Sequence, residues 1–362
     1  MSLLTGARIR INGYLYTMVL KRFLFRIDPE KAHKLFINIG RVFGNSFLSR
    51  MLTRVCFSYQ NKMLEQKIFG IKFRNPVGLA AGFDKNGEII NILESVGFGF
   101  SEIGSVTAKK CFGNKGKRLR RIKEKESLWV NLGLNNVGAD SLRENIIHSK
   151  TKIPLGISVA KTNCKETVDE NIAIDDYIYS LNILKDLGDY FVLNISCPNA
   201  YGGQPFTDAR RYEKLLRKVF KLGINKPIIV KLSPDLAKIN ADSIIRISKK
   251  YKIKGFICSN LTKKKEDKFG GYSGKILQEK SDELLSYVYK KTKGRFVLIG
   301  VGGVSSAEEA YRKIKLGANL LELITGMVYK GPGIIGEINY GIVELLKKEG
   351  YKNISEAVGK GL

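Results

Sequence analysis

The chain has 362 residues, 44% of them hydrophobic and 10% aromatic, which is enough apolar material for a large core and excludes global disorder. Its 62 Lys and Arg against 34 Asp and Glu give a net charge of +28. This excess is typical either of a protein that binds polyanions or of a lysine-rich, solvated surface. Five scattered cysteines without a CxxC pair and only two histidines argue against a disulfide framework, a Ser-His-Asp triad or a metal site.

The first 60 or so residues alternate basic and apolar positions without a small-residue cleavage site, which predicts helices and no signal peptide. Lys21, Arg22 and Arg26 border an expected apolar helix face made of Tyr14, Tyr16, Val19, Leu20, Phe23 and Leu24. Such a face suits the surface of an anionic membrane, and it equally suits packing on the body of the protein. No apolar run reaches the roughly 18 residues that span a bilayer.

From residue 77 onward, apolar β-rich runs alternate with charged helical stretches. The runs cover residues 77–81, 100–106, 155–161, 190–196, 227–233, 254–260, 296–303 and 319–325. Helices are expected between them, at residues 86–96, 170–187, 208–221, 240–251, 279–293 and 305–316. Eight such units predict an α/β fold, a (β/α)8 TIM barrel over residues 63–362 with an N-terminal helical extension over residues 1–62.

The segment 107–130 is too long for a plain connection between two barrel strands. It carries the only dense basic block, KGKRLRRIKEK at residues 115–125, and we expect it to be an insertion near the barrel mouth. Nothing around it resembles a nucleic-acid recognition module with interleaved aromatic residues, so nucleic-acid binding is only a remote alternative.

Glycines follow the seventh and eighth predicted strands, in IGVGGVSS and ITG. Barrels often bind a phosphate group at this place, with backbone amides turned toward it. We therefore expect a phosphate cradle from Gly302, Gly303, Thr325 and Gly326, with plain strand-to-helix turns as the alternative.

Other polar residues at predicted strand ends are candidates for ligand binding. Lys85 and Lys231 could pair with a ring that gains negative charge, although each alone could be a solvated surface lysine. Asn194, Asn199 and Asn260 could present amide groups to a planar, carbonyl-rich ligand, although each alone could be a turn or capping residue.

Cys197 lies in VLNISCPNAYGG, at the end of the fourth predicted strand. A buried cysteine is usually an inert filler, but this one is surrounded by polar and turn-forming residues. Because a thiol has an ordinary pKa of about 8.5, a positioned cysteine can take a carbon-bound proton as a general base.

Seven motifs together resemble the dihydroorotate dehydrogenases, which are FMN-dependent (β/α)8 enzymes of pyrimidine biosynthesis. They are NPVGLAAGFDKNGE, GFGFSEIGSVT, NISCPNA, VKLSPD, GGYSGK, IGVGGVSS and TGMVYKGPG, and the similarity runs from about residue 27 to about 340. IDPEKAHKLF (27–36) resembles the membrane-associated, quinone-reducing class 2 branch. In that branch a two-helix extension forms a quinone tunnel.

The resemblance implies oxidation of (S)-dihydroorotate to orotate in UMP biosynthesis, with Cys197 as base, Lys85 stabilising the developing charge and a quinone as acceptor. Implied FMN contacts are Ala81, Gly82, Lys85, Ser105, Ser158, Asn194, Lys231, Ser259, Gly274, Gly303, Thr325 and Gly326. Implied substrate contacts are Lys85, Asn131, Gly133, Leu134, Asn194, Asn199 and Asn260, and the quinone side would include His33 and Arg121. The expected location is the cytoplasmic side of a bacterial inner membrane, as a peripheral protein, with the mitochondrial inner membrane and the cytoplasm as alternatives.

The sequence also departs from the family pattern. Class 2 enzymes use serine as the base, whereas Cys197 is typical of the soluble class 1 branch. Without a gap, Val130 stands at the position of a substrate-binding asparagine, while a one-residue deletion would put Asn131 there. Leu261 replaces a hydroxyl residue, Ser158 an asparagine and Ile324 a tyrosine. A related FMN barrel oxidoreductase that acts on another cyclic amide or dihydropyrimidine is therefore the second hypothesis.

Overall fold

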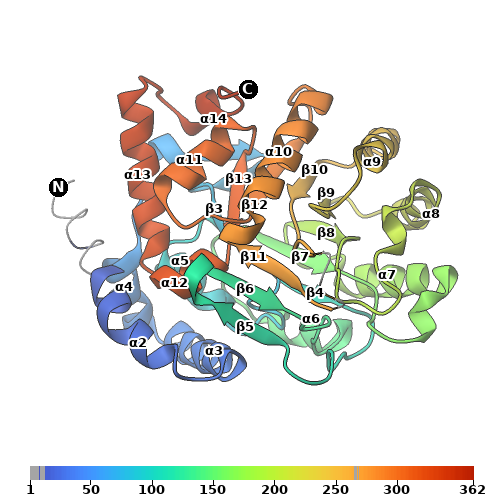
Figure 1. The fold of residues 1–362 in the computed structure, drawn as a ribbon, viewed down its shortest axis with the longest axis horizontal. Helices are drawn as coiled ribbons and strands as arrows, with labels where there is room; N and C mark the ends of the chain where they lie inside the picture. The colour runs from blue at the N-terminus through green and yellow to red at the C-terminus, as the bar shows by residue number, and fades with distance from the viewer. Residues whose placement is uncertain (1–7, 9–12, 265–266, 268) are drawn as a thin grey trace.

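The structure is a computed structural model that describes residue 8 and residues 13–264, 267 and 269–362. Its centre is a closed barrel of eight parallel strands (Figure 1), in the spatial order β10-β12-β13-β3-β4-β7-β8-β9. The strands are β3 (Val77–Leu79), β4 (Phe100–Val106), β7 (Leu155–Val159), β8 (Tyr190–Asn194), β9 (Ile228–Leu232), β10 (Gly255–Cys258), β12 (Val297–Val301) and β13 (Leu320–Leu323). Each lies within a predicted run, and the predicted TIM barrel is confirmed.

The outer face of the barrel is covered by helices (Figure 1). They are α5 (Ile90–Val96), α6 (Ala139–Ile147), α7 (Glu170–Leu184), α8 (Ala209–Phe220), α9 (Lys238–Lys250), α10 (Gln278–Thr292), α11 (Ala307–Lys315) and α13 (Ile334–Lys348). The short α12 (Thr325–Lys330) lies at the cavity described below, and α14 (Ile354–Ala357) follows α13. Side chains of Asp169, Asp208 and Ser306 cap the first turns of α7, α8 and α11. These caps explain why the helices begin close to their predicted positions.

The helix predicted from residue 86 begins only at Ile90. The Asp84 carboxylate accepts hydrogen bonds from the backbone N–H groups of Glu88 and Ile89, at 2.8 and 3.0 Å. These bonds hold residues 81–89 in a series of turns instead of a helix, and several of these residues face the cavity described below.

The interior of the barrel is filled by apolar side chains at its N-terminal end. Inward-facing residues of this cluster include Phe100, Tyr190, Ile229, Ile257, Ile299 and Leu320. A two-stranded sheet of β1 (Gln66–Ile68) and β2 (Ile71–Phe73) adds Ile68 and Phe73 to them. This plug separates the two ends of the barrel and leaves the C-terminal end for ligands.

The insertion forms a hairpin of β5 (Leu119–Ile122) and β6 (Ser127–Val130). Strand β11 (Gly271–Gly274), from the segment after β10, pairs with β6 and completes a three-stranded antiparallel sheet. In Figure 1 this sheet lies beside the barrel and next to the extension, as predicted for an insertion near the mouth.

The extension consists of η1 (Tyr16–Leu20), α2 (Lys21–Leu24), α3 (Pro29–Asn45) and α4 (Phe47–Phe57). Helices α3 and α4 pack against α5, and Gly40 permits a close approach, since a Cβ there would lie 2.8 Å from Ile89 Cγ2. The predicted boundary after residue 62 falls within η2 (Lys62–Leu64). None of the described helices is long and apolar enough to cross a bilayer.

The residues expected on one apolar face of the extension divide between packing on the body of the protein and exposure. Tyr16 does not share an exposed face with Tyr14 and Phe23, because its side chain is buried and its hydroxyl donates to the Val328 carbonyl at 2.9 Å. The turn from Tyr16 is π-helical, so the angular spacing that places these residues on one face of an α-helix does not apply. Tyr14, Val19, Leu20 and Phe23 remain exposed.

Candidate active site

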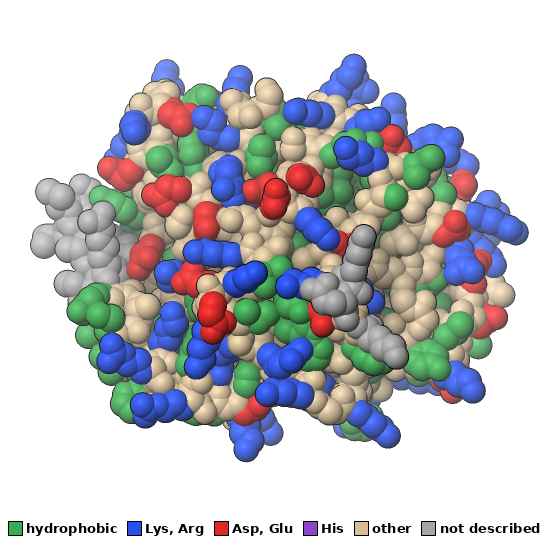
Figure 2. Space-filling model, viewed as in Figure 1, with side chains coloured by type: hydrophobic (Ala, Val, Ile, Leu, Met, Phe, Trp, Pro, Cys, Tyr) green, Lys and Arg blue, Asp and Glu red, His purple; other side chains and the backbone are tan. Residues whose placement is uncertain are grey.

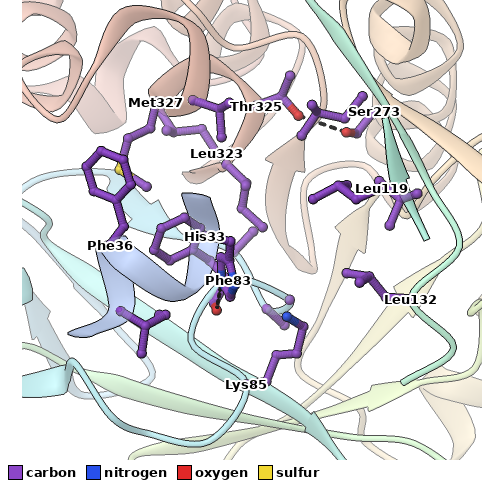
Figure 3. A pocket seen from close by; sticks show the side chains of 18 of the residues that line it. His33, Phe36, Phe83, Lys85, Leu119, Leu132, Ser273, Leu323, Thr325 and Met327 are labelled. Atoms are coloured by element: carbon purple, nitrogen blue, oxygen red, sulfur yellow. Dashed lines mark hydrogen bonds between the residues drawn. The ribbon is translucent and has the colours of Figure 1, made fainter. Parts of the chain in front are cut away.

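A cavity of about 950 Å³ opens at the C-terminal end of the barrel. Strand ends form its inner part, and the hairpin β5–β6, helix α3 and the segment around α12 form its outer part. Figure 3 shows Lys85, Ser273 and Thr325 near the strands, while Phe36, Phe83 and Met327 lie toward the extension. The cavity therefore has a polar inner end and an apolar outer end.

Most of the residues predicted for the site line this one cavity, although they come from all parts of the chain. They are His33, Ala81, Gly82, Lys85, Ser105, Arg121, Gly133, Leu134, Asn194, Cys197, Asn199, Lys231, Ser259, Asn260, Gly274, Gly303, Thr325 and Gly326.

Ser158 and Asn131 are not among the lining residues. Ser158 is fully buried behind Ser105, with 2.8 Å between the two hydroxyl oxygens. Side chains of an extended chain alternate between faces, so Val130 and Leu132 face the cavity and Asn131 between them turns away. The Asn131 Oδ1 atom accepts a hydrogen bond from Asn114 at 2.8 Å, and Asn114 also donates to the Asn199 carbonyl at 3.1 Å.

A chain of hydrogen bonds fixes the polar inner end. Asn194 Nδ2 donates to Ser105 Oγ at 2.8 Å, and Asn194 Oδ1 accepts from Asn260 Nδ2 at 3.1 Å. The second bond of Asn260 Nδ2 goes to Ser196 Oγ at 3.0 Å. Because both ends of the Asn194 amide are engaged, its orientation is determined, and Asn260 is held beside it.

The Cys197 thiol also faces this inner end. Burial raises its pKa to about 11, although the backbone of Asn199 and the ammonium of Lys161 act against the rise. Lys161 is itself buried and donates to the Tyr201 carbonyl at 2.6 Å, which ties it to the turn that follows Cys197. Cys197 is thus a protonated thiol at neutral pH, and its thiolate, when formed, is a strong base.

Lys85, in the turns that follow β3, provides a positive charge at the cavity. Burial lowers its pKa to about 8, partly offset by Glu30. Glu30 belongs to α3 and forms an ion pair with Arg118, with 3.0 Å between Arg118 Nε and Glu30 Oε1. The extension therefore contributes a charge next to the barrel's own lysine, which remains an ammonium at neutral pH.

The loops after β12 and β13 lie in direct contact. A Cβ at residue 326 would be 2.1 Å from the Val304 carbonyl oxygen, so only glycine fits there. The Gly303 carbonyl accepts from Gln278 Nε2 at 2.8 Å, while the N–H groups of Gly303 and Gly326 have no acceptor among the described residues. Ser273 and Thr325 add a pair of hydroxyls 2.8 Å apart. This arrangement is a cradle for an anionic group.

The outer end is mostly apolar, and its two predicted polar residues are tied to the backbone. His33 Nε2 donates to the Phe83 carbonyl at 2.8 Å, and the two rings pack edge to face (Figure 3). Burial lowers the pKa of His33 to about 4, so its ring is neutral at physiological pH. Arg121 lies 4.7 Å from the centre of the Phe25 ring and donates to the Ile27 carbonyl at 2.7 Å.

Two functional candidates were missed from the sequence: Glu102 and Glu322. Both are fully buried inside the barrel, and each places a carboxylate oxygen near Lys231 Nζ, at 3.6 and 3.8 Å. A charged residue within an apolar run, as in FSEIGSV and NLLELIT, was the available signal.

The chain was compared with known proteins. The sequence profile of the family "Dihydroorotate dehydrogenase" matches residues 63–346. The "Dihydroorotate dehydrogenase (quinone)" of Sulfurovum sp. (strain NBC37-1) is 39% identical over 353 residues, covering 94% of this chain and 97% of the relative. That of Sulfurimonas denitrificans is 38% identical, with the same coverage.

Solved structures give the same result. The crystal structure of DHODH from Eimeria tenella in complex with ferulenol superposes with a TM-score of 0.83 at 25% identity, covering 92% of this chain and 95% of that one. The ligand-free form gives a TM-score of 0.81 at the same identity. The similarity includes the extension as well as the barrel, and it confirms the family indicated by the motifs: this chain belongs to the dihydroorotate dehydrogenase family.

Proposed function

We propose that this protein oxidises (S)-dihydroorotate to orotate with FMN as cofactor and a quinone as electron acceptor, in the de novo biosynthesis of UMP. The observation that carries the proposal is the single cavity, which joins Cys197, Lys85 and three asparagines at its inner end to an apolar outer end formed by the extension. Membership of the family supports the same reaction.

The residues of the cavity fit FMN. The cradle after β12 and β13 suits its phosphate, and Lys231 and the hydroxyl–amide chain from Ser105 to Asn260 suit the polar edge of its ring. Held by these residues, FMN would supply a hydride acceptor and a carrier of electrons to the quinone. The residues assigned to it are those predicted, with Ser158 acting through Ser105 instead of touching the cofactor.

Cys197 is assigned to remove the proton from C5 of dihydroorotate. Asn194, Asn199 and Asn260 are assigned to hold the cyclic amide. Asn199 Oδ1 supports this, because it is buried, has no hydrogen-bond partner among the described residues and can accept from a ligand N–H. The Lys85 ammonium is placed to stabilise negative charge that develops during the reaction. Asn131 is assigned an indirect role, since Asn114 links it to Asn199.

The outer end is assigned to the quinone, with His33 and Arg121 at its polar positions. Exposed apolar side chains on α3 and α4 support peripheral binding to a membrane surface, on the cytoplasmic side of an inner membrane; they include Leu35, Ile39, Val42, Phe43, Phe47, Leu48, Met51, Leu52 and Val55. In Figure 2, basic side chains are scattered among acidic and apolar ones on the face shown, which gives no support to a nucleic-acid-binding surface.

A second candidate substrate is another cyclic amide or dihydropyrimidine. Val130 and Leu261 favour it, because both line the cavity with apolar side chains where the family pattern has polar ones. An anaerobic titration of the purified holoenzyme distinguishes the two. Dihydroorotate should bleach the flavin absorbance, whereas dihydrouracil should not. A flavin that stays oxidised with dihydroorotate, but is reduced by dithionite, would contradict the proposed substrate.

A further inference from the structure

Three charged side chains meet inside the barrel, directly below the cavity. Glu102 projects from β4, Lys231 from β9 and Glu322 from β13. Both glutamate side chains are 0% exposed and that of Lys231 is 6% exposed. Lys231 and Glu322 line the floor of the cavity, and Glu102 lies behind them.

The layer beneath these residues is apolar. Two positions earlier on the same strands lie Phe100, Ile229 and Leu320, which belong to the plug of the barrel. Among the described residues, this layer leaves water no polar route from below, so the charges are compensated by one another, by the Tyr190 hydroxyl or by a ligand above them.

The charges of the three groups do not balance if all are ionised, since two carboxylates face one ammonium. The carboxylate oxygens of Glu102 and Glu322 are buried, and none has a hydrogen-bond donor among the described residues. A further titratable group, the hydroxyl of Tyr190 on β8, interacts with both carboxylates and has no hydrogen-bond partner among the described residues. An uncompensated buried carboxylate takes up a proton instead of remaining charged.

We propose that Glu322 holds a proton, so that Glu102, Glu322 and Lys231 form a neutral unit that positions the Lys231 ammonium at the floor of the cofactor site. Glu102 and Glu322 are positioning residues. The role of this unit toward FMN rests on the proposed function. At 3.6 and 3.8 Å, neither carboxylate holds Lys231 in a tight hydrogen bond, so its N–H groups can turn toward the cavity.

The electrostatics of the unit agree with this assignment. Burial, followed by the charge of Glu102, raises the pKa of Glu322 well above its ordinary value. Burial opposes the charge on Lys231, but the two glutamates outweigh it and raise its pKa. The expected state at neutral pH is thus one carboxylate, one carboxylic acid and one ammonium.

Infrared difference spectra of the wild-type protein against its variants test the proton on Glu322 directly. Holoenzyme at about pH 8, where exposed carboxyl groups are ionised, should show the carbonyl band of one carboxylic acid. Glu102→Gln or Glu322→Gln should each remove that band, because one carboxylate then balances Lys231. Glu344→Gln, at an exposed surface ion pair, is the matched control and should leave the band in place. Absence of the band in the wild-type protein, or its persistence in both single variants, would overturn the proposal.

The midpoint potential of bound FMN tests the role toward the cofactor. Each single variant keeps the unit neutral, so the ratio of affinities for reduced and oxidised FMN should change less than tenfold. This corresponds to a change of less than about 30 mV in the midpoint potential for two electrons. The double variant Glu102→Gln/Glu322→Gln leaves the ammonium uncompensated and should raise that ratio by tenfold or more. A double variant with an unchanged potential would contradict the positioning role. If dihydroorotate does not reduce the flavin of the wild-type holoenzyme while the infrared bands behave as expected, only the proposed function is contradicted.

Discussion

The two ends of the cavity are lined by different kinds of side chains. At the inner end, polar side chains come from barrel strands and most are fixed by hydrogen bonds, as in the chain from Ser105 through Asn194 to Asn260. At the outer end, apolar side chains come from helices, and His33 is neutral. Proton removal requires groups held in place, whereas exchange of an apolar acceptor requires a mostly apolar slot, in which Arg121 is the polar position assigned to the quinone. The two half-reactions should therefore respond to different substitutions.

Replacement of the base should have the largest effect. Cys197→Ala should slow flavin reduction by dihydroorotate by about 10²- to 10⁴-fold, because no other described group at the inner end is assigned to take the proton. Reoxidation by quinone and FMN content should be unchanged. Anaerobic stopped-flow absorbance measures both steps, and Cys164→Ala, a half-buried thiol outside the cavity lining, is the control. An unchanged reduction rate would remove Cys197 from the mechanism.

The second-largest expected effect is the change in the rate of flavin reduction with pH. The reactive form has a Cys197 thiolate and a Lys85 ammonium, with pKa values of about 11 and about 8. Below pH 8 the thiolate fraction rises about tenfold per unit while the ammonium persists, so the rate should rise roughly 100-fold between pH 6 and 8. Above pH 8 the loss of the ammonium should offset the gain in thiolate, which gives a plateau. A rate that is constant from pH 6 to 8 would contradict this assignment.

Substitution at the outer end should affect the other half-reaction. Arg121→Ala removes the charge beside Phe25 and the hydrogen bond to the Ile27 carbonyl, and a charged hydrogen bond is worth about 1.5–3 kcal/mol. Quinone reoxidation should fall by roughly 10- to 100-fold, with reduction by dihydroorotate unchanged. Arg120→Ala is the matched control, because Arg120 packs on Trp129 and does not line the cavity. Equal loss in both half-reactions would show that the two ends are not separable.

The smallest expected effect concerns docking of the extension. Tyr16→Phe removes the hydrogen bond to the Val328 carbonyl and should weaken docking by about 1 kcal/mol. The expected result is faster amide hydrogen exchange in η1 and α2, with little change in the barrel. Tyr14→Phe, at an exposed position, should behave like the wild-type protein. If amide hydrogen exchange in η1 and α2 is equally fast in both variants, the buried Tyr16 hydroxyl does not hold the extension in place.

Much of the fold could be predicted because its signals are local. The apolar runs gave the eight strands, and the glycine motifs and NISCPNA placed the cradle and Cys197 at strand ends. Non-local or irregular features could not be predicted. The pairing of β11 with β6 joins segments about 145 residues apart, and the π-helical turn at Tyr16 alters a pattern that assumes an α-helix.

Within the site, the residue types were easier to predict than their partners. Lys231 was expected to meet a ligand, but its nearest charged groups are Glu102 and Glu322, which become neighbours only when β4, β9 and β13 close into the barrel. Whether Asn131 or Val130 faces the cavity depends on the register of the β5–β6 hairpin, and the sequence does not fix that register.

The central claim is that one cavity supports two separable half-reactions. Sequential anaerobic stopped-flow mixing of the wild-type holoenzyme, first with (S)-dihydroorotate and then with a short-chain quinone, tests it most directly. We expect bleaching of the flavin in the first step, with formation of orotate, and full recovery of the flavin absorbance in the second. A flavin that dihydroorotate fails to bleach, or that only oxygen reoxidises, would contradict the account.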